Sequence, residues 1–86
     1  MNITDVRINL TNKKDSSVKA VASITIDDEF VVHGIKVIKD DDKAFISMPA
    51  RKDNKGNFID VAHPIKTDTR VMLQDMILAK YNEIAK

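Results

Sequence analysis

Residues 18–38, VKAVASITIDDEFVVHGIKVI, decide the fold class of this 86-residue chain. From Val18 to Ile26, small and aliphatic side chains recur at every second position, which is the period of a half-buried β-strand. The acidic link Asp27–Asp28–Glu29 is short enough for a tight turn, and a second apolar run, residues 30–38, follows it at once. Strand, short turn and strand together predict an antiparallel hairpin.

The second strand of this hairpin, the third strand expected in the chain, does not alternate cleanly. Its large apolar side chains fall on both faces: Phe30, Val32 and Ile38 on one, and Val31, Ile35 and Val37 on the other. We therefore expect this strand to be buried on both sides. Gly34 in its middle predicts a β-bulge or a close approach of another segment, because glycine has no side chain to pack.

Three further short strands are expected on either side of the hairpin. Residues 3–11 alternate between apolar and polar side chains and lead into a polar turn at residues 12–17. Residues 44–48 and 58–62 are short apolar runs on either side of a turn around residues 53–57. Pro49 is expected to end the strand at 44–48, because proline cannot donate a hydrogen bond to a strand ladder.

The apolar period changes to three or four residues near the end of the chain. An amphipathic helix over about residues 67–85 is predicted from one stripe: Leu73, Met76, Ile77, Tyr81 and Ile84. Thr67 or Asp68 is expected to cap its first turn by accepting a backbone N–H. The predicted architecture is a single α+β domain over residues 1–86, with a four- to five-stranded antiparallel sheet (about residues 2–62) and one C-terminal amphipathic helix.

A single helix can cover only one face of this sheet. Because an exposed apolar strand needs a partner, we expect a homodimer that assembles through the sheet. The candidate dimer-interface residues all belong to the third strand: Val31, Val32, Ile35 and Val37.

Composition excludes several classes of protein. The chain has no cysteine, so disulfides and cysteine-based zinc sites are excluded, and this composition fits a reducing cytoplasm. A net charge of +1 gives no indication of nucleic-acid binding by itself. No apolar run approaches the roughly 20 residues of a membrane-spanning helix, and the first residues do not resemble a signal peptide. We expect a cytoplasmic protein with no membrane contact.

No constellation of residues predicts an enzyme, a metal site, a cofactor or a small-molecule substrate. His33 and His63 are the only histidines, and neither has the spacing of metal ligands or of a nucleophile–base pair. With two glycines, the chain has no loop of the kind that cradles phosphates in nucleotide-binding folds. The acidic runs at residues 27–29 and 40–42 lack the ligand spacing of a calcium loop and are interpreted as solvated turns.

The densest group of cations lies between the two prolines, Pro49 and Pro64. Arg51, Lys52 and Lys55 surround the turn at residues 53–57, and no aromatic residue is expected among them, which argues against base stacking of the single-strand type. Charged loops are usually only solvated. A solvated hairpin and a phosphate-binding loop therefore both remain open at this stage.

Two more cations, Lys66 and Arg70, flank the expected start of the helix. A helix N-terminus presents free N–H groups and a partial positive charge, so a cation there adds to an anion site. All five cations converge if the segment AHPI, residues 62–65, folds the basic loop back against the helix. His63 and Pro64 would then support the loop.

Four blocks of sequence, in this order and spacing, resemble the SpoVG family of bacterial proteins (stage V sporulation protein G, the septation regulators). They are MNITDVRI (1–8), DDEFVVHGIKVI (27–38), FISMPARK (45–52), and DVAHPI (60–65) followed by DTR (68–70). The resemblance implies a small homodimeric regulator of gene expression, sporulation and septation that binds DNA and, in some members, RNA. By position, the family's basic loop corresponds to Arg51 and Lys52, and its helix-start arginine corresponds to Arg70.

Two functions are thus under consideration. The first is a regulator that binds DNA, and RNA in the manner of some relatives, through the basic loop and the helix start. The second is a protein-interaction module that assembles through its third strand, with nucleic-acid binding incidental. The salt dependence of duplex DNA binding separates them, because phosphate contacts release counterions.

Overall fold

A computed structural model describes residues 2–11, 17–41 and 43–85 of the chain. These residues form a four-stranded antiparallel sheet in the order β1-β2-β3-β4, a two-stranded antiparallel sheet of β5 and β6, and one helix. The elements are β1 (Ile3–Leu10), β2 (Val18–Ile26), β3 (Phe30–Asp40), β4 (Lys43–Ser47), β5 (Ala50–Lys52), β6 (Phe58–Asp60) and α1 (Thr67–Ile84). The predicted α+β class, with an antiparallel sheet and a C-terminal helix, is confirmed.

Parts of two predicted turns lie outside the described residues, namely residues 12–16 and Asp42. Within the described ranges, no helix combines the length and the apolar character needed to cross a membrane.

The hairpin of β2 and β3 has the tight acidic turn expected from the sequence. Asp27 and Asp28 both adopt positive φ angles, 53° and 57°, and the Glu29 N–H donates to the Ile26 carbonyl oxygen at 3.0 Å. Positive φ at both central residues is the type I′ turn geometry, whose twist matches that of the strands, and the Ile26–Phe30 pair leaves Glu29 as one extra residue after the turn. Aspartate is one of the few non-glycine residues that adopt this conformation readily.

A β-bulge in β3 corrects the predicted assignment of side chains to faces. Ala22 pairs with Ile35 and Ile24 pairs with Val32, so β3 has one more residue than β2 between these pairs. Gly34 lies in this bulge with a φ of 81°. Because one extra residue moves all later side chains to the opposite face, Val32 lies on the same face as Ile35. The predicted bulge is confirmed, and the prediction that Val32 lies on the face opposite Ile35 is wrong.

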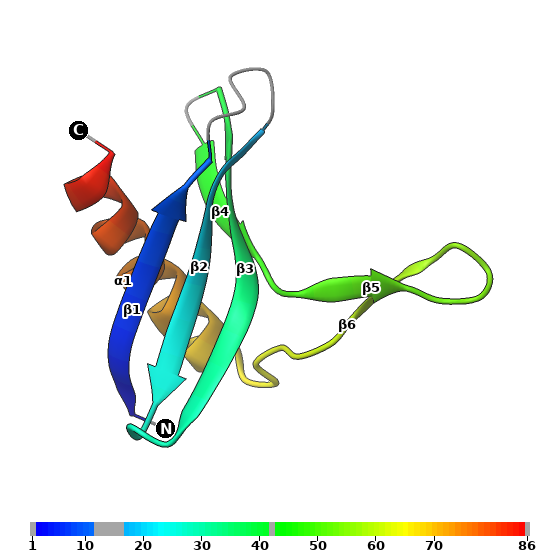
Figure 1. Cartoon of the computed structure of the whole chain (residues 1–86), viewed down its shortest axis with the longest axis horizontal. Helices are drawn as coiled ribbons and strands as arrows, with labels where there is room; N and C mark the ends of the chain where they lie inside the picture. The colour runs from blue at the N-terminus through cyan, green and yellow to red at the C-terminus, as the bar shows by residue number, and fades with distance from the viewer. Residues whose placement is uncertain (1, 12–16, 42, 86) are drawn as a thin grey trace.

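The helix α1 covers one face of the four-stranded sheet (Figure 1). Its buried residues, Leu73, Ile77 and Tyr81, are three members of the predicted stripe. They pack in one core with Met48 and with six small or aliphatic side chains of the sheet: Ala20, Ala22, Ile24, Ile35, Val37 and Ile46. The alanines at two central positions of the sheet leave room for the helix side chains. No second helix of the described residues covers the opposite face of the sheet.

The start of α1 differs from the prediction. Lys66 is the N-cap residue, with extended backbone angles, and no side chain makes a capping hydrogen bond. Thr67 and Asp68 already belong to the helix, so the prediction that one of them caps it is wrong. The position of the cap depends on where the chain leaves the preceding segment, which residue type alone does not determine.

The segment predicted as a fifth strand, residues 58–62, is shorter and pairs elsewhere. Its strand residues, Phe58–Asp60, form β6 and pair with β5 rather than with the main sheet. Figure 1 shows β5 and β6 extending sideways, away from both the four-stranded sheet and the helix. The chain therefore has two regions, a sheet–helix body and a projecting hairpin, residues 49–61, which we call the arm.

Candidate functional site

The arm is closed by hydrogen bonds at its base and at its turn. The Val61 N–H donates to the Pro49 carbonyl oxygen at 2.7 Å, and the strand pairs Ala50–Asp60, Arg51–Ile59 and Lys52–Phe58 follow outward. The strand at 43–47 ends before Pro49, as the sequence predicted. All six residues of β5 and β6 are exposed, so the arm is held by its own ladder and not by packing on the body.

Asp53 organises the turn of the arm. One carboxylate oxygen of Asp53 accepts the N–H groups of Lys55 and Asn57, at 2.8 and 2.9 Å. The Asp53 N–H donates to the Asn57 carbonyl oxygen at 2.8 Å, and Gly56 has a φ of 84°. A side-chain oxygen that accepts nearby backbone N–H groups fixes a turn without any hydrophobic core. The turn is thus preorganised although it is surrounded by solvent.

The three cations of the arm make no ion pair with any residue that the structure describes. Arg51, Lys52 and Lys55 are all exposed. Within the described part of the chain, the ion pairs are Arg7 with Asp5 (3.0 Å) and Lys80 with Glu83 (3.8 Å), both on the body. The arm also carries two carboxylates, but Asp53 accepts backbone N–H groups and Asp60 makes no ion pair within the described residues. The arm cations are therefore available to an external anion.

The structure separates the five predicted cations into two groups. Lys66 and Arg70 are exposed at the start of α1, whereas the arm extends away from the body instead of folding back against the helix (Figure 1). Asp68 also lies in the first helical turn, where its negative charge offsets the positive end of the helix. The helix start is therefore a weaker candidate for an anion site than the arm.

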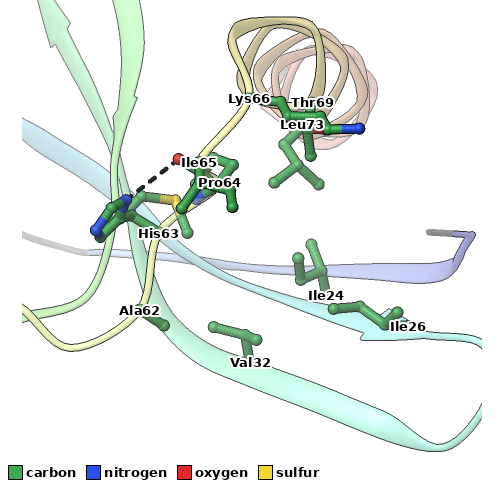
Figure 2. Close-up of a pocket in the computed structure, with 11 residues that line it drawn as sticks. Ile24, Ile26, Val32, Ala62, His63, Pro64, Ile65, Lys66, Thr69 and Leu73 are labelled. Atoms are coloured by element: carbon green, nitrogen blue, oxygen red, sulfur yellow. Dashed lines mark hydrogen bonds between the residues drawn. The ribbon is translucent and has the colours of Figure 1, made fainter.

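His63 and Pro64 lie in the segment that joins the arm to the helix. The Nδ1 of His63 lies 3.2 Å from the Pro64 carbonyl oxygen and donates to it in the tautomer that carries the proton on Nδ1. Pro64 and its neighbours border an apolar groove of about 440 Å³ between the sheet and the helix start (Figure 2). The groove walls include Ile24, Val32 and Leu73. Both residues thus shape the base of the arm, and their support of the loop stays a prediction.

The four residues predicted at a dimer interface have different surroundings. Ile35 and Val37 are completely buried in the core of their own chain, and Val32 lines the groove. Val31 pairs with Thr25 on the face opposite the helix and is 45% exposed. That open face also carries the half-exposed side chains of Ile38 and Phe45. Among the predicted set, Val31 is therefore the residue that is exposed to solvent, and the interface itself stays a prediction.

Phe58 is the residue of the arm that the sequence interpretation missed. It lies directly across from Lys52, and the Lys52 Nζ is 5.4 Å from the centroid of the Phe58 ring. An aromatic residue therefore belongs to the basic patch, contrary to the prediction. Counting outward in equal steps from the turn at 53–57 pairs residue 52 with residue 58. Interpreting residues 50–60 as a hairpin would therefore have predicted, from the sequence, that Phe58 lies beside Lys52.

The described residues contain no group of three or more histidine and acidic side chains placed to hold a metal ion. Nor do they contain a buried polar or charged residue. The chemistry that this site offers is recognition: exposed cations and an exposed aromatic ring on a narrow two-stranded ribbon. The fold and the site thus define a small α+β protein with a basic β-hairpin arm.

Comparison with known proteins identifies the family to which this chain belongs. The model of the SpoVG family matches residues 1–83. "Putative septation protein SpoVG" of Agathobacter rectalis is 57% identical over 81 residues, which cover 94% of this chain and 92% of that protein. "Putative septation protein SpoVG 2" of Listeria monocytogenes is 43% identical over 86 residues, which cover 100% of this chain and 83% of that protein. The chain belongs to the SpoVG family, as its four sequence blocks indicated.

Proposed function

We propose that this protein is a cytoplasmic regulator that binds DNA as a homodimer and contacts phosphates with its arm. The observation that carries this proposal is the projecting ribbon, on which Arg51, Lys52 and Lys55 are exposed and make no ion pair within the described ranges. A two-stranded β-ribbon is narrow enough to enter the major groove of B-form DNA. Arginine can hold a phosphate through two parallel N–H bonds, while each lysine acts as a point charge.

The family supports a cellular role for this binding. Relatives from several bacteria are named septation proteins, and the family name refers to sporulation. We assign to this chain the corresponding role, the regulation of genes for septation or sporulation. RNA is included as a ligand because phosphates alone do not distinguish the two nucleic acids.

The test is the combined substitution Arg51→Ala and Lys52→Ala. Affinity for duplex DNA should fall by at least about tenfold, or about 1.4 kcal/mol. The slope of log affinity against log salt should flatten by about 0.9 for each phosphate that the variant no longer neutralises. The matched control is Lys39→Ala with Lys80→Ala, which removes two exposed cations from the body instead of from the arm. Equal weakening in both double variants would mean that net charge, and not the arm, determines binding.

The homodimer is supported by the open face of the sheet. Val31, Ile38 and Phe45 leave apolar surface there, and the helix of the same chain covers the other face. Self-association through this face would hide that surface and place two arms on one assembly. Sedimentation equilibrium should show a dimer at tens of micromolar, on the order of 10⁻⁵ M, weakened by Val31→Lys. A monomer at that concentration would exclude the dimer.

The second candidate function is a protein-interaction module whose exposed apolar residues at the start of β3 bind another protein. Phe30 and Val31 are 65% and 45% exposed. This alternative predicts no DNA binding even at low salt, so the same titration separates the two functions.

A further inference from the structure

Phe58 is the most exposed aromatic residue among the described residues, with 73% of its surface accessible. Directly paired residues of two antiparallel strands point to the same face, so Phe58 and Lys52 share one face of the arm. The Lys52 Nζ at 5.4 Å from the ring centroid is within the range of a cation–π contact. An apolar ring and a cation are thus presented side by side.

The structure gives this ring no role in folding. Phe58 is not among the residues that form the core cluster or pack against it, and both arm strands are exposed along their whole length. The turn of the arm is fixed by hydrogen bonds of Asp53 and not by aromatic packing. Beyond its contact with Lys52, the ring is not part of the core, and an exposed apolar side chain of this kind is a candidate contact for a ligand.

The ligand that fits this pair has a flat apolar surface and a negative charge beside it. A nucleotide meets both requirements, since the face of a base stacks on an aromatic ring and its phosphate pairs with a cation. Arg51, the next residue along β5, supplies a second cation on the opposite face of the ribbon. The Phe58 face thus offers contact with one base and with the phosphate beside it, while Arg51 adds positive charge to the other face of the arm.

We propose that Phe58 stacks on a nucleobase while Lys52, on the same face of the arm, holds the neighbouring phosphate. This inference rests on the proposed function and adds a base contact to it. The base could come from an unpaired strand, which exposes its base faces, or from a duplex step that the ring opens as a wedge. The contact recognises the π-face that all bases share, so it carries little sequence preference.

The direct test is the Phe58→Trp variant, because the chain contains no tryptophan and the new indole is the only one. We would titrate the full-length variant with single-stranded oligothymidylate, single-stranded oligouridylate and a short mixed-sequence duplex. Stacking should quench the tryptophan fluorescence. The matched control is Phe30→Trp, which replaces an exposed phenylalanine (65%) on the body and should show no quenching. Binding without quenching in the Phe58→Trp variant would overturn the proposal.

Affinity measurements separate stacking from simple apolar contact. Phe58→Leu keeps an apolar side chain but removes the ring, so affinity should fall by about fivefold or more, while Phe58→Tyr should restore it. The salt slope should not change, because every cation that contacts a phosphate is still present. If Phe58→Leu weakens binding to single strands alone, the stacked base belongs to an unpaired strand. If it also weakens binding to the duplex, the base belongs to a base-pair step that the ring opens.

Two results would overturn the proposal in distinguishable ways. If the unaltered protein binds no nucleic acid at low salt, the proposed function fails and this inference fails with it. If it binds and Phe58→Leu binds equally well, only the stacking inference fails. Should Phe58→Leu instead weaken self-association in sedimentation equilibrium, the ring is a contact between two copies of the chain.

Discussion

The body and the arm contain the same kinds of apolar residue, but the body buries them and the arm exposes them. In the body, the large aliphatic side chains of Ile35, Val37 and Ile77 have no accessible surface at all, and the helix and the sheet form one core. In the arm, Phe58, Ile59 and Val61 remain exposed, and hydrogen bonds of the backbone and of the Asp53 carboxylate define the shape. We therefore expect substitutions in the body to change stability, and substitutions in the arm to change nucleic-acid binding, the function proposed for it.

The largest effect is expected for Ile77→Ala in the body. Removing a fully buried isoleucine leaves a cavity, and the free energy of unfolding should fall by about 2–5 kcal/mol. A domain of this size has little stability to lose, so the variant should be close to unfolded. Urea denaturation followed by circular dichroism measures the decrease.

Val71→Ala is the control for this variant, since Val71 lies on the same helix but is half exposed. It should change the free energy of unfolding by no more than about 0.5 kcal/mol. If Ile77→Ala keeps its unfolding midpoint but loses DNA binding, the stripe would face a ligand and the division into body and arm would be wrong.

A smaller and more selective effect is expected for Gly34→Ala. The φ of Gly34 is 81°, a conformation that strains a residue with a Cβ, and the new Cβ would lie 3.6 Å from the Pro49 Cβ, an ordinary contact. The cost is thus backbone strain alone, about 1–3 kcal/mol of the free energy of unfolding. Thermal and urea unfolding should both detect it.

Gly56→Ala provides a matched comparison in the arm. Gly56 has nearly the same φ, 84°, and no atom within 4 Å of the position of its Cβ. The intrinsic strain is therefore similar, but the arm can rearrange without disturbing the core, so global unfolding should change little. An equal decrease of stability in the two variants would show that arm and body unfold as one unit.

The sequence predicted those parts of the fold that depend on local pattern. The alternation over residues 18–26 and the acidic link that follows are sufficient to specify a strand and a tight turn, because both depend on near neighbours. Three of the five residues of the predicted helix stripe, Leu73, Ile77 and Tyr81, are buried, whereas Ile84 in the last turn is 42% exposed. The cations of the arm could be recognised as a group because they are close together in the sequence.

Features that depend on pairing between segments were not predicted correctly. The bulge at Gly34 was expected, but its consequence was not: Val32 lies on the same face as Ile35. Likewise, Phe58–Asp60 have the alternation of a strand whether they join the main sheet or pair with Ala50–Lys52. The apolar pattern gives the period of a strand but does not determine which other strand it pairs with. Phe58 was therefore assigned to the body, and its position beside Lys52 was missed.

A small effect on stability is expected when the arm is shortened to its base. Replacing Arg51–Ile59 by Asn-Gly leaves the Ala50–Asp60 pair joined by a two-residue hairpin turn, for which Asn-Gly is a favoured sequence. The bond from the Val61 N–H to the Pro49 carbonyl oxygen still closes the base. Shortening the connection from nine residues to two changes its closure entropy by more than two doublings of length, so the free energy of unfolding should change by no more than about 1.3 kcal/mol.

The variant with the shortened arm also tests whether stability depends on the body and DNA binding on the arm. Its denaturant dependence should match that of the unaltered chain, because this slope follows the surface buried on folding and the exposed arm buries little. DNA binding, in contrast, should fall further than in the Arg51→Ala, Lys52→Ala variant, because Lys55 and Phe58 are removed as well. A variant that folds and sediments as the unaltered protein does, but no longer binds DNA, would assign binding to the arm. A variant that fails to fold would show that the arm contributes to the stability of the body.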